Sequence, residues 1–190
     1  MEMVMGLRAY FKGNRRRLTF SLNYKVATST TLALLILGTF ALFATEFNNP
    51  QTLGNLPVPV KLLAAWFQSV VARTAGFNSI DIGAMGNASL FTMIALMFIG
   101  ASPGGTGGGI KTTTFRILLV CTLAVLRGKE KVLCYRRQIP PSRVLKTVAV
   151  VVGSGLVVIL ATMLISISNP DLEFIAVLFE TVSAFATVGL

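Results

Sequence analysis

Residues 100–111 read GASPGGTGGGIK, and they interrupt an apolar stretch of about forty residues between Asn87 and Arg127. Six glycines, Pro103 and Lys111 make this segment a poor helix, whereas each apolar flank is long enough for about three helical turns. In a bilayer, a broken helix is tolerated only where its irregular backbone is buried in protein or lines a water-filled path. The segment therefore predicts a membrane helix with a functional interruption.

The composition agrees with a membrane location. Of the 190 residues, 54% are hydrophobic and 13% are charged, with a mean hydropathy of +0.75, whereas soluble domains average about 25% charged residues. We therefore expect an all-α integral membrane protein. Histidine is absent, which excludes histidine-based catalysis and histidine metal ligation. Cys121 and Cys134 alone cannot form a metal site, and we expect free thiols.

Two segments are long and apolar enough to cross a membrane, 26–44 and 144–167. Each is followed by a shorter apolar segment, 59–73 in the first case and, in the second, a helix that Asn169-Pro170 would start and that would end near Ala184. These shorter segments cannot span a bilayer. They fit re-entrant helices that enter the membrane and return as extended backbone.

Basic residues are concentrated in two places. Six of the 17 Lys and Arg residues lie in 1–25 and seven lie in 127–146, and the net charge is +10. A positive excess next to apolar spans predicts cytoplasmic orientation, not nucleic-acid binding. We therefore expect both basic segments on the cytoplasmic side, with Glu46 and Asp81 outside.

The two halves of the chain repeat each other with a period of about 113 residues. FQSV at 67–70 matches FETV at 179–182, and TAGF at 74–77 matches TVGL at 187–190. The chain thus contains one complete helix-pore loop-helix unit and part of a second. We divide it into a basic segment 1–25, a first repeat 26–127, a basic linker 128–143 and a partial repeat 144–190.

A T-x-G loop after a short re-entrant helix suits the binding of a dehydrated cation. Glycine permits backbone conformations that aim successive carbonyl oxygens into a pore, and the C-terminus of the helix adds partial negative charge. The alternative is that each glycine only ends a helix in a left-handed cap. The predicted selectivity filter comprises Thr74, Ala75, Gly76, Phe77, Asn78, Thr187, Val188, Gly189 and Leu190, with K⁺ on the backbone carbonyls of Thr74, Ala75, Gly76, Thr187, Val188 and Gly189.

The function of the glycine-rich segment can be interpreted in several ways. It fails as a phosphate-binding loop because Ile110 separates Gly109 from Lys111, and its G-x-S-x-G pattern at 100–104 has no histidine to activate Ser102. A flexible kink remains open, as does a mobile loop that obstructs a pore. Lys111 would place positive charge in the ion path or would instead reach the cytoplasmic interface beside Arg116 and Arg127. The predicted gating loop comprises Gly100, Ser102, Pro103, Gly104, Gly105, Thr106, Gly107, Gly108, Gly109 and Lys111.

Three segments carry a family resemblance: RTAGFNSID at 73–81, SPGGTGGGIKTTTF at 102–115 and SAFATVGL at 183–190. Together they resemble the ion-translocating subunit of the Ktr/Trk/HKT superfamily of potassium transporters, and bacterial Ktr in particular. The resemblance implies four linked helix-pore loop-helix repeats around one pore, of which this chain would be the third and the start of the fourth. It also implies that the glycine-rich segment obstructs the pore and moves on activation.

The same resemblance implies where the protein is located, what it transports and which partners it has. We expect a multi-pass protein of the cell membrane that transports K⁺, or both K⁺ and Na⁺, without a covalently bound cofactor and without enzymatic activity. Its partners would be the remaining repeats of the same subunit, a second copy in a homodimer, the lipid bilayer and a cytoplasmic nucleotide-binding regulatory subunit. The alternatives are a membrane-embedded enzyme acting on a phosphorylated substrate and a non-conducting scaffold subunit.

Overall fold

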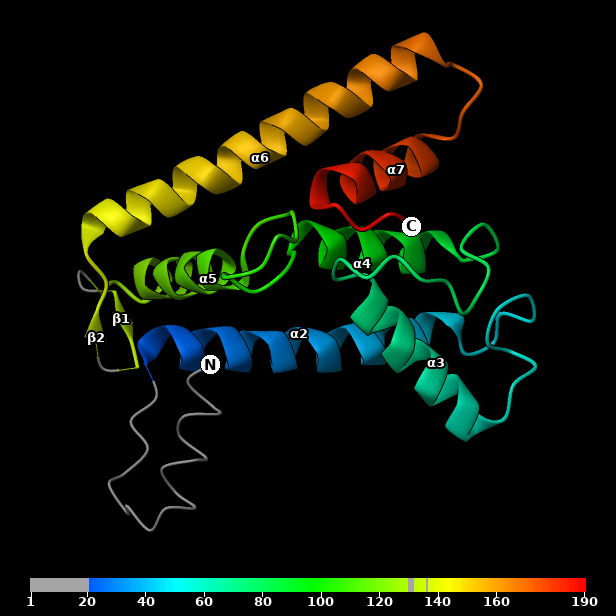
Figure 1. Ribbon diagram of the computed structural model, residues 1–190, viewed down its shortest axis with the longest axis horizontal. Helices are drawn as coiled ribbons and strands as arrows, with labels where there is room; N and C mark the ends of the chain where they lie inside the picture. The colour runs from blue at the N-terminus through cyan, green and yellow to red at the C-terminus, as the bar shows by residue number, and fades with distance from the viewer. Residues whose placement is uncertain (1–20, 130–131, 136) are drawn as a thin grey trace.

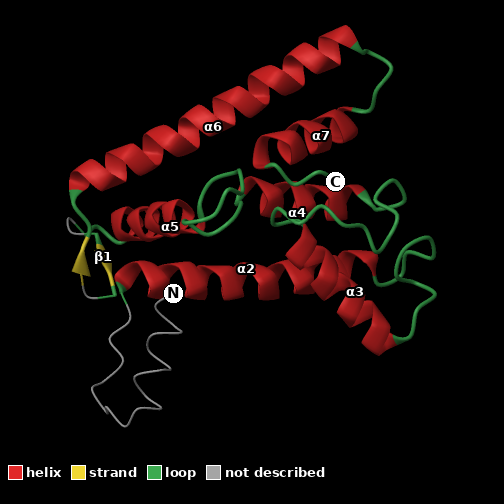
Figure 2. Ribbon diagram, viewed as in Figure 1, coloured by secondary structure: helices red, strands yellow, loops and turns green. Residues whose placement is uncertain are grey.

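The computed structural model describes residues 21–129, 132–135 and 137–190. The predicted basic segment therefore lies outside the described residues apart from 21–25. The described chain is mostly helical (Figures 1 and 2). Its elements are α2 (Leu22–Glu46), α3 (Val58–Val71), α4 (Asn87–Phe98), α5 (Thr112–Leu126), β1 (Leu133–Cys134), β2 (Arg137–Gln138), α6 (Pro141–Ser168) and α7 (Phe174–Ala186).

Among the described residues, α2 and α6 are the two helices long and apolar enough to cross a membrane. They have 25 and 28 residues and so reach about 37 and 42 Å at 1.5 Å per residue, more than a ~30 Å hydrocarbon core needs. Both begin earlier than the hydropathy predicts. The hydroxyl of Ser21 caps α2 by accepting from the N–H of Tyr24, and Pro141 starts α6 at a position where its missing N–H costs nothing.

The basic linker holds a short hairpin that the sequence analysis did not predict. Strands β1 and β2 pair antiparallel, with Leu133 opposite Gln138 and Cys134 opposite Arg137. Cys134 and Ile139 are buried with Val26 in a small core at this end of the molecule. The all-α expectation is thus wrong for these four residues, because apolar side chains of the linker pack against α2.

Two short helices follow the two long ones in the same order, α3 after α2 and α7 after α6. The predicted start of the second short helix is wrong. Asn169 ends α6, and α7 begins only at Phe174 after Glu173, so Pro170 lies in the connecting turn. The prediction failed because Asn and Pro are common both at helix starts and just after helix ends.

The helices lie in layers (Figure 1), and most of the buried side chains form one main core. Helix α2 contacts α3, α4 and α5, while α6 lies against α5 and α7, and α7 also packs on α4. Helices α4 and α5, which flank the glycine-rich segment, thus lie between the two long helices. The core includes Leu42, Met93, Met97 and Val182, each at most 1% exposed.

Glu46 fixes the join between the end of α2 and the start of α4. Its carboxylate is buried and accepts from the N–H of Gly86 at 3.0 Å and from the side chains of Asn49 at 2.7 Å, Thr52 and Ser89. A buried carboxylate is tolerated where hydrogen-bond donors surround it, and negative charge also suits a helix N-terminus. Glu46 therefore ties the end of α2 to the residues at the start of α4.

Candidate functional site

The first T-x-G loop (residues 74–78) follows α3 directly. Thr74 has φ +70° and Gly76 has φ +69°, whereas Ala75 between them is not left-handed. A β-branched residue at positive φ is strained and persists only where its surroundings hold it. Phe77 and Asn78 continue the loop at the surface, with Phe77 68% exposed.

The second T-x-G loop (residues 187–190) repeats this backbone after α7. Thr187 has φ +55° and Gly189 has φ +80°, with Val188 again not left-handed between them. The loop folds back on the helix through two bonds of the Ser183 hydroxyl, which accepts from the N–H of Leu190 at 3.0 Å and donates to the Leu190 carbonyl at 3.2 Å. In both loops, alternate residues thus have left-handed backbone.

This geometry bears on the helix-cap alternative. The left-handed C-cap of α7 is Thr187 and not a glycine, and α3 ends at Ala72 in right-handed conformation. Gly76 and Gly189 each lie beyond the helix end and two residues after a left-handed threonine. Ending a helix therefore does not account for either glycine.

The two T-x-G loops lie side by side, although 113 residues separate Gly76 from Gly189. A β-carbon built on Gly76 would collide with the carbonyl oxygen of Val188 and would lie 3.4 Å from that of Gly189. Gly76 thus has two requirements, a left-handed backbone and no side chain. At Gly189 a β-carbon would meet nothing within 4 Å among the described residues, so only its φ favours glycine.

The glycine-rich loop (residues 100–111) touches both T-x-G loops. A β-carbon on Gly107 would lie 3.0 Å from Oγ1 of Thr74, and one on Gly108 would lie 2.7 Å from the carbonyl carbon of Ala186. The N–H of Gly108 also donates to Oγ1 of Thr187 at 2.7 Å. The absence of side chains at 107 and 108 lets the loop reach the two left-handed threonines.

The rest of the loop divides into an anchored part and a free part. Gly109 is left-handed and packs on Gly100, which closes the loop at its base. Residues 103–106 are exposed, and β-carbons on Gly104 and Gly105 would meet nothing within 4 Å. The ammonium of Lys111 donates to the Gly107 carbonyl, so the positive charge of Lys111 lies next to the loop backbone.

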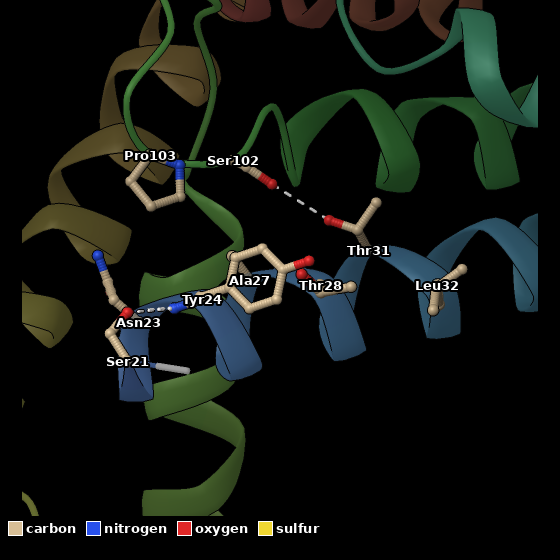
Figure 3. Close-up of a pocket in the computed structure, with 9 residues that line it drawn as sticks. All are labelled: Ser21, Asn23, Tyr24, Ala27, Thr28, Thr31, Leu32, Ser102 and Pro103. Carbon is tan, nitrogen blue, oxygen red and sulfur yellow. Dashed lines mark hydrogen bonds between the residues drawn. The ribbon is translucent and has the colours of Figure 1, made fainter. Parts of the chain in front are cut away.

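The N-terminal end of the loop is tied to α2. The guanidinium of Arg73 donates to the carbonyl of Thr31 at 3.4 Å and to that of Gly100 at 3.3 Å. The hydroxyls of Thr31 and Ser102 lie 3.2 Å apart across the wall of a cavity of about 530 Å³ that Pro103 and the first turns of α2 line (Figure 3). Arg73 thus braces the loops by binding carbonyls.

A second cavity, of about 480 Å³, lies between the segment after the first T-x-G loop and α7. Asn78 and Leu190 line it together with three carboxylates, those of Asp81, Glu173 and Glu180. The T-x-G loops therefore have acidic side chains on one side and the glycine-rich loop on the other. Such an arrangement raises the local concentration of cations on the acidic side.

Comparison with known proteins identifies the family of this chain. Residues 6–190 match the TrkH family model, described as a cation transport protein. The chain belongs to the TrkH family. Its members are transporters of cations and not enzymes. This excludes the alternative of a membrane-embedded enzyme that acts on a phosphorylated substrate.

Individual relatives agree with the family. The TrkH-family chain is 43% identical over 177 residues to the Ktr system potassium uptake protein B of Bacillus subtilis, covering 93% of the chain and 40% of that protein. It is 42% identical to the protein of the same name from Vibrio alginolyticus, over 87% of the chain and 36% of that protein. It is 38% identical to the potassium/sodium uptake protein NtpJ of Enterococcus hirae, over 90% and 38%. The chain thus spans about two fifths of these relatives.

Both T-x-G loops and the glycine-rich loop of the TrkH-family chain are recognisable in the sequence, but their contacts with one another are not. The sequence predicts an unusual backbone at the glycines, whereas in the structure Thr74 and Thr187 share it. No local pattern predicts the hydrogen bonds of Ser183 and of Thr31. The repeat pattern hints at the threonines, because Thr occupies the same place in both loops.

Proposed function

We propose that this chain forms part of the pore of a potassium uptake subunit in the cell membrane, and that K⁺, or both K⁺ and Na⁺, passes down its electrochemical gradient. Backbone carbonyls of 74–76 and 187–189 replace the water around the ion. Carbonyl dipoles suit this task because a dehydrated cation needs several oxygen ligands at once. Asp81 and Glu180 attract cations to the outer side of these loops.

The observation that carries this proposal is the matched backbone of the two T-x-G loops. A strained threonine costs about 1–3 kcal/mol, and here the same strain occurs twice at equivalent positions. An αL cap would need the conformation once per helix and would place glycine there. Two equivalent loops that meet at Gly76 and Val188 are expected where repeats surround a common ion path.

The proposed architecture extends beyond this chain. Residues 26–127 form one helix-pore loop-helix repeat and 144–190 begin another, with 1–25 and the linker 128–143 on the cytoplasmic side. The complete subunit has four such repeats, assembles as a homodimer and responds to a cytoplasmic nucleotide-binding subunit. The names of the Ktr relatives, which describe a potassium uptake system, support partner subunits.

The glycine-rich loop acts as the gate in this proposal. It contacts both T-x-G loops through Gly107 and Gly108, and the ammonium of Lys111 remains at the loop. Seated there, the loop obstructs the path below the filter and brings a charge that repels a cation. Its exposed portion, 103–106, has the room to move.

Replacing the filter glycines tests the proposal. In the complete subunit, Gly76→Ser and Gly189→Ser should each weaken the preference for K⁺ over Na⁺, because a side chain at their φ values costs about 1–2 kcal/mol and redirects the carbonyls. Gly76→Ser should have the larger effect, since its side chain also meets the Val188 carbonyl. The measurement is K⁺ rescue of an uptake-deficient cell together with the K⁺/Na⁺ uptake ratio.

The matched control is Gly83→Ser. Gly83 is exposed, does not have a left-handed backbone, and a β-carbon there would make only an ordinary contact with Asp81 at 3.4 Å. Full rescue and an unchanged ion ratio in both filter variants would refute the filter and favour the non-conducting scaffold.

A further inference from the structure

A groove of about 220 Å³ lies at the end of α5 next to β1. Its floor is apolar, formed by Val120, Leu123 and Ala124 of α5 with Leu133 of β1. Arg127 and Lys129 line it as well. The groove therefore combines a hydrocarbon surface with two cationic side chains.

The local fold builds this combination. α5 ends at Leu126, and Gly128, at φ +64°, turns the chain back so that the N–H of Lys129 donates to the Ala124 carbonyl at 2.9 Å. Arg127 and Lys129 are thus held on the same turn. Within the described part of the chain, no hydrogen bond or ion pair engages either cationic side chain, and both residues are exposed.

The position of the groove also indicates its surroundings. The first residues of α2 and of α6 lie at the same end of the molecule as the hairpin, so this end is where two membrane-length helices leave the bilayer (Figure 1). Exposed Leu126 and Val125 just before Arg127 belong in hydrocarbon, whereas Arg127 and Lys129 belong at the level of lipid headgroups. Positive charge marks this as the cytoplasmic face, where anionic lipids are found.

We propose that this groove binds an anionic phospholipid, with its phosphate between Arg127 and Lys129 and an acyl chain along Val120, Leu123 and Leu133. A soluble phosphate compound would satisfy the two cations but would leave the apolar floor in water. A zwitterionic lipid would cover the floor but would bring its own positive charge toward the cations. The inference rests on the cytoplasmic placement of this end, which is part of the proposed function, but it does not depend on ion conduction.

The test measures lipid binding to the complete subunit in detergent by native mass spectrometry, with phosphatidylglycerol and phosphatidylcholine of the same acyl chains. The double variant Arg127→Gln/Lys129→Gln should lower the affinity for phosphatidylglycerol by up to roughly 25-fold, about fivefold for each exposed ion pair with the phosphate that is lost. Its affinity for phosphatidylcholine should stay the same. Leu123→Ser should weaken both lipids, because it removes part of the shared apolar floor.

The matched control is Arg143→Gln/Lys146→Gln, which removes two exposed basic residues from the start of α6 that do not line the groove. This variant should change the affinity for phosphatidylglycerol less than twofold. An equal loss in both double variants would show diffuse surface attraction and overturn the proposal. So would competition by millimolar glycerol phosphate, which would indicate a soluble ligand, or equal binding of the two lipids by the unmodified protein.

Discussion

Replacing Gly108 with alanine should release the glycine-rich loop from the T-x-G loops. The new β-carbon would lie 2.7 and 2.8 Å from the carbonyl carbon and oxygen of Ala186 and 2.9 Å from the carbonyl oxygen of Phe185. All three atoms belong to the backbone at the end of α7, so no side chain can rotate away to make room. The loop must move instead.

The size of the effect follows from two terms. Overpacking of this kind costs about 1–3 kcal/mol, and losing the bond from the Gly108 N–H to Thr187 costs about 0.5–1.5 kcal/mol. Together they disfavour the seated loop by roughly 1.5–4.5 kcal/mol, and every 1.4 kcal/mol is a factor of ten in an equilibrium. If the seated loop is what blocks the ion path, the population of unblocked pores should rise at least tenfold.

The assay is initial Rb⁺ uptake into vesicles that contain the complete subunit, normalised to protein amount, without the regulatory partner. Gly108→Ala should raise basal uptake about tenfold or to the level reached with the partner, whichever is lower. Gly105→Ala, whose β-carbon meets nothing within 4 Å, should stay within about twofold of the unmodified protein. Uptake that falls or does not change in Gly108→Ala, with normal protein amount, would refute the assignment of the loop as a gate.

Three further predictions follow from the described contacts. Lys111→Ala should raise basal Rb⁺ uptake less than Gly108→Ala does, because it removes a charge from the loop but leaves the loop seated; equal or lower uptake would contradict this. Glu46→Gln should lower the melting temperature of the complete subunit in detergent by a few °C, since losing charged hydrogen bonds to a buried group costs about 1.5–3 kcal/mol. An unchanged melting temperature would show that the charge of Glu46 contributes nothing to stability. In a background without native cysteines, a cysteine in place of Asn48 should react with an impermeant reagent from outside, and one in place of Gln138 should not; the reverse pattern would overturn the topology.

The sequence was sufficient to predict where the helices and the special loops lie. Hydropathy located both long helices, because a bilayer demands continuous apolar length and few other structures need it. Repetition located the T-x-G loops, since two copies of a short helix and its loop are more informative than one glycine. The glycine-rich loop followed from the conflict between its composition and its apolar flanks.

Other features depend on contacts between distant residues and could not be read from local patterns. The short hairpin forms because Cys134 and Ile139 find Val26 of α2, which lies more than a hundred residues earlier. Asn169 and Pro170 predict the wrong start for α7 because these residues fit both ends of a helix. In the sequence, Glu46 is only an acidic residue at the end of an apolar span, but in the structure hydrogen-bond donors from residues 49, 52, 86 and 89 surround its carboxylate.

Thr74 and Thr187 show why the candidate site itself resists prediction. β-Branched residues rarely adopt positive φ, so backbone propensities predict an extended or helical conformation for both threonines. Contacts from other elements hold them where they are: Gly107 lies under the side chain of Thr74, and the Gly108 N–H binds the hydroxyl of Thr187. The left-handed threonines and the glycines at 107 and 108 therefore form one packed unit. A change in either loop should alter the other, which is why Gly108→Ala must be assayed for the K⁺/Na⁺ ratio as well as for uptake. If the loop only blocks the path, the ratio stays constant while uptake rises; if it also holds Thr187 in its strained conformation, the preference for K⁺ falls as the loop leaves.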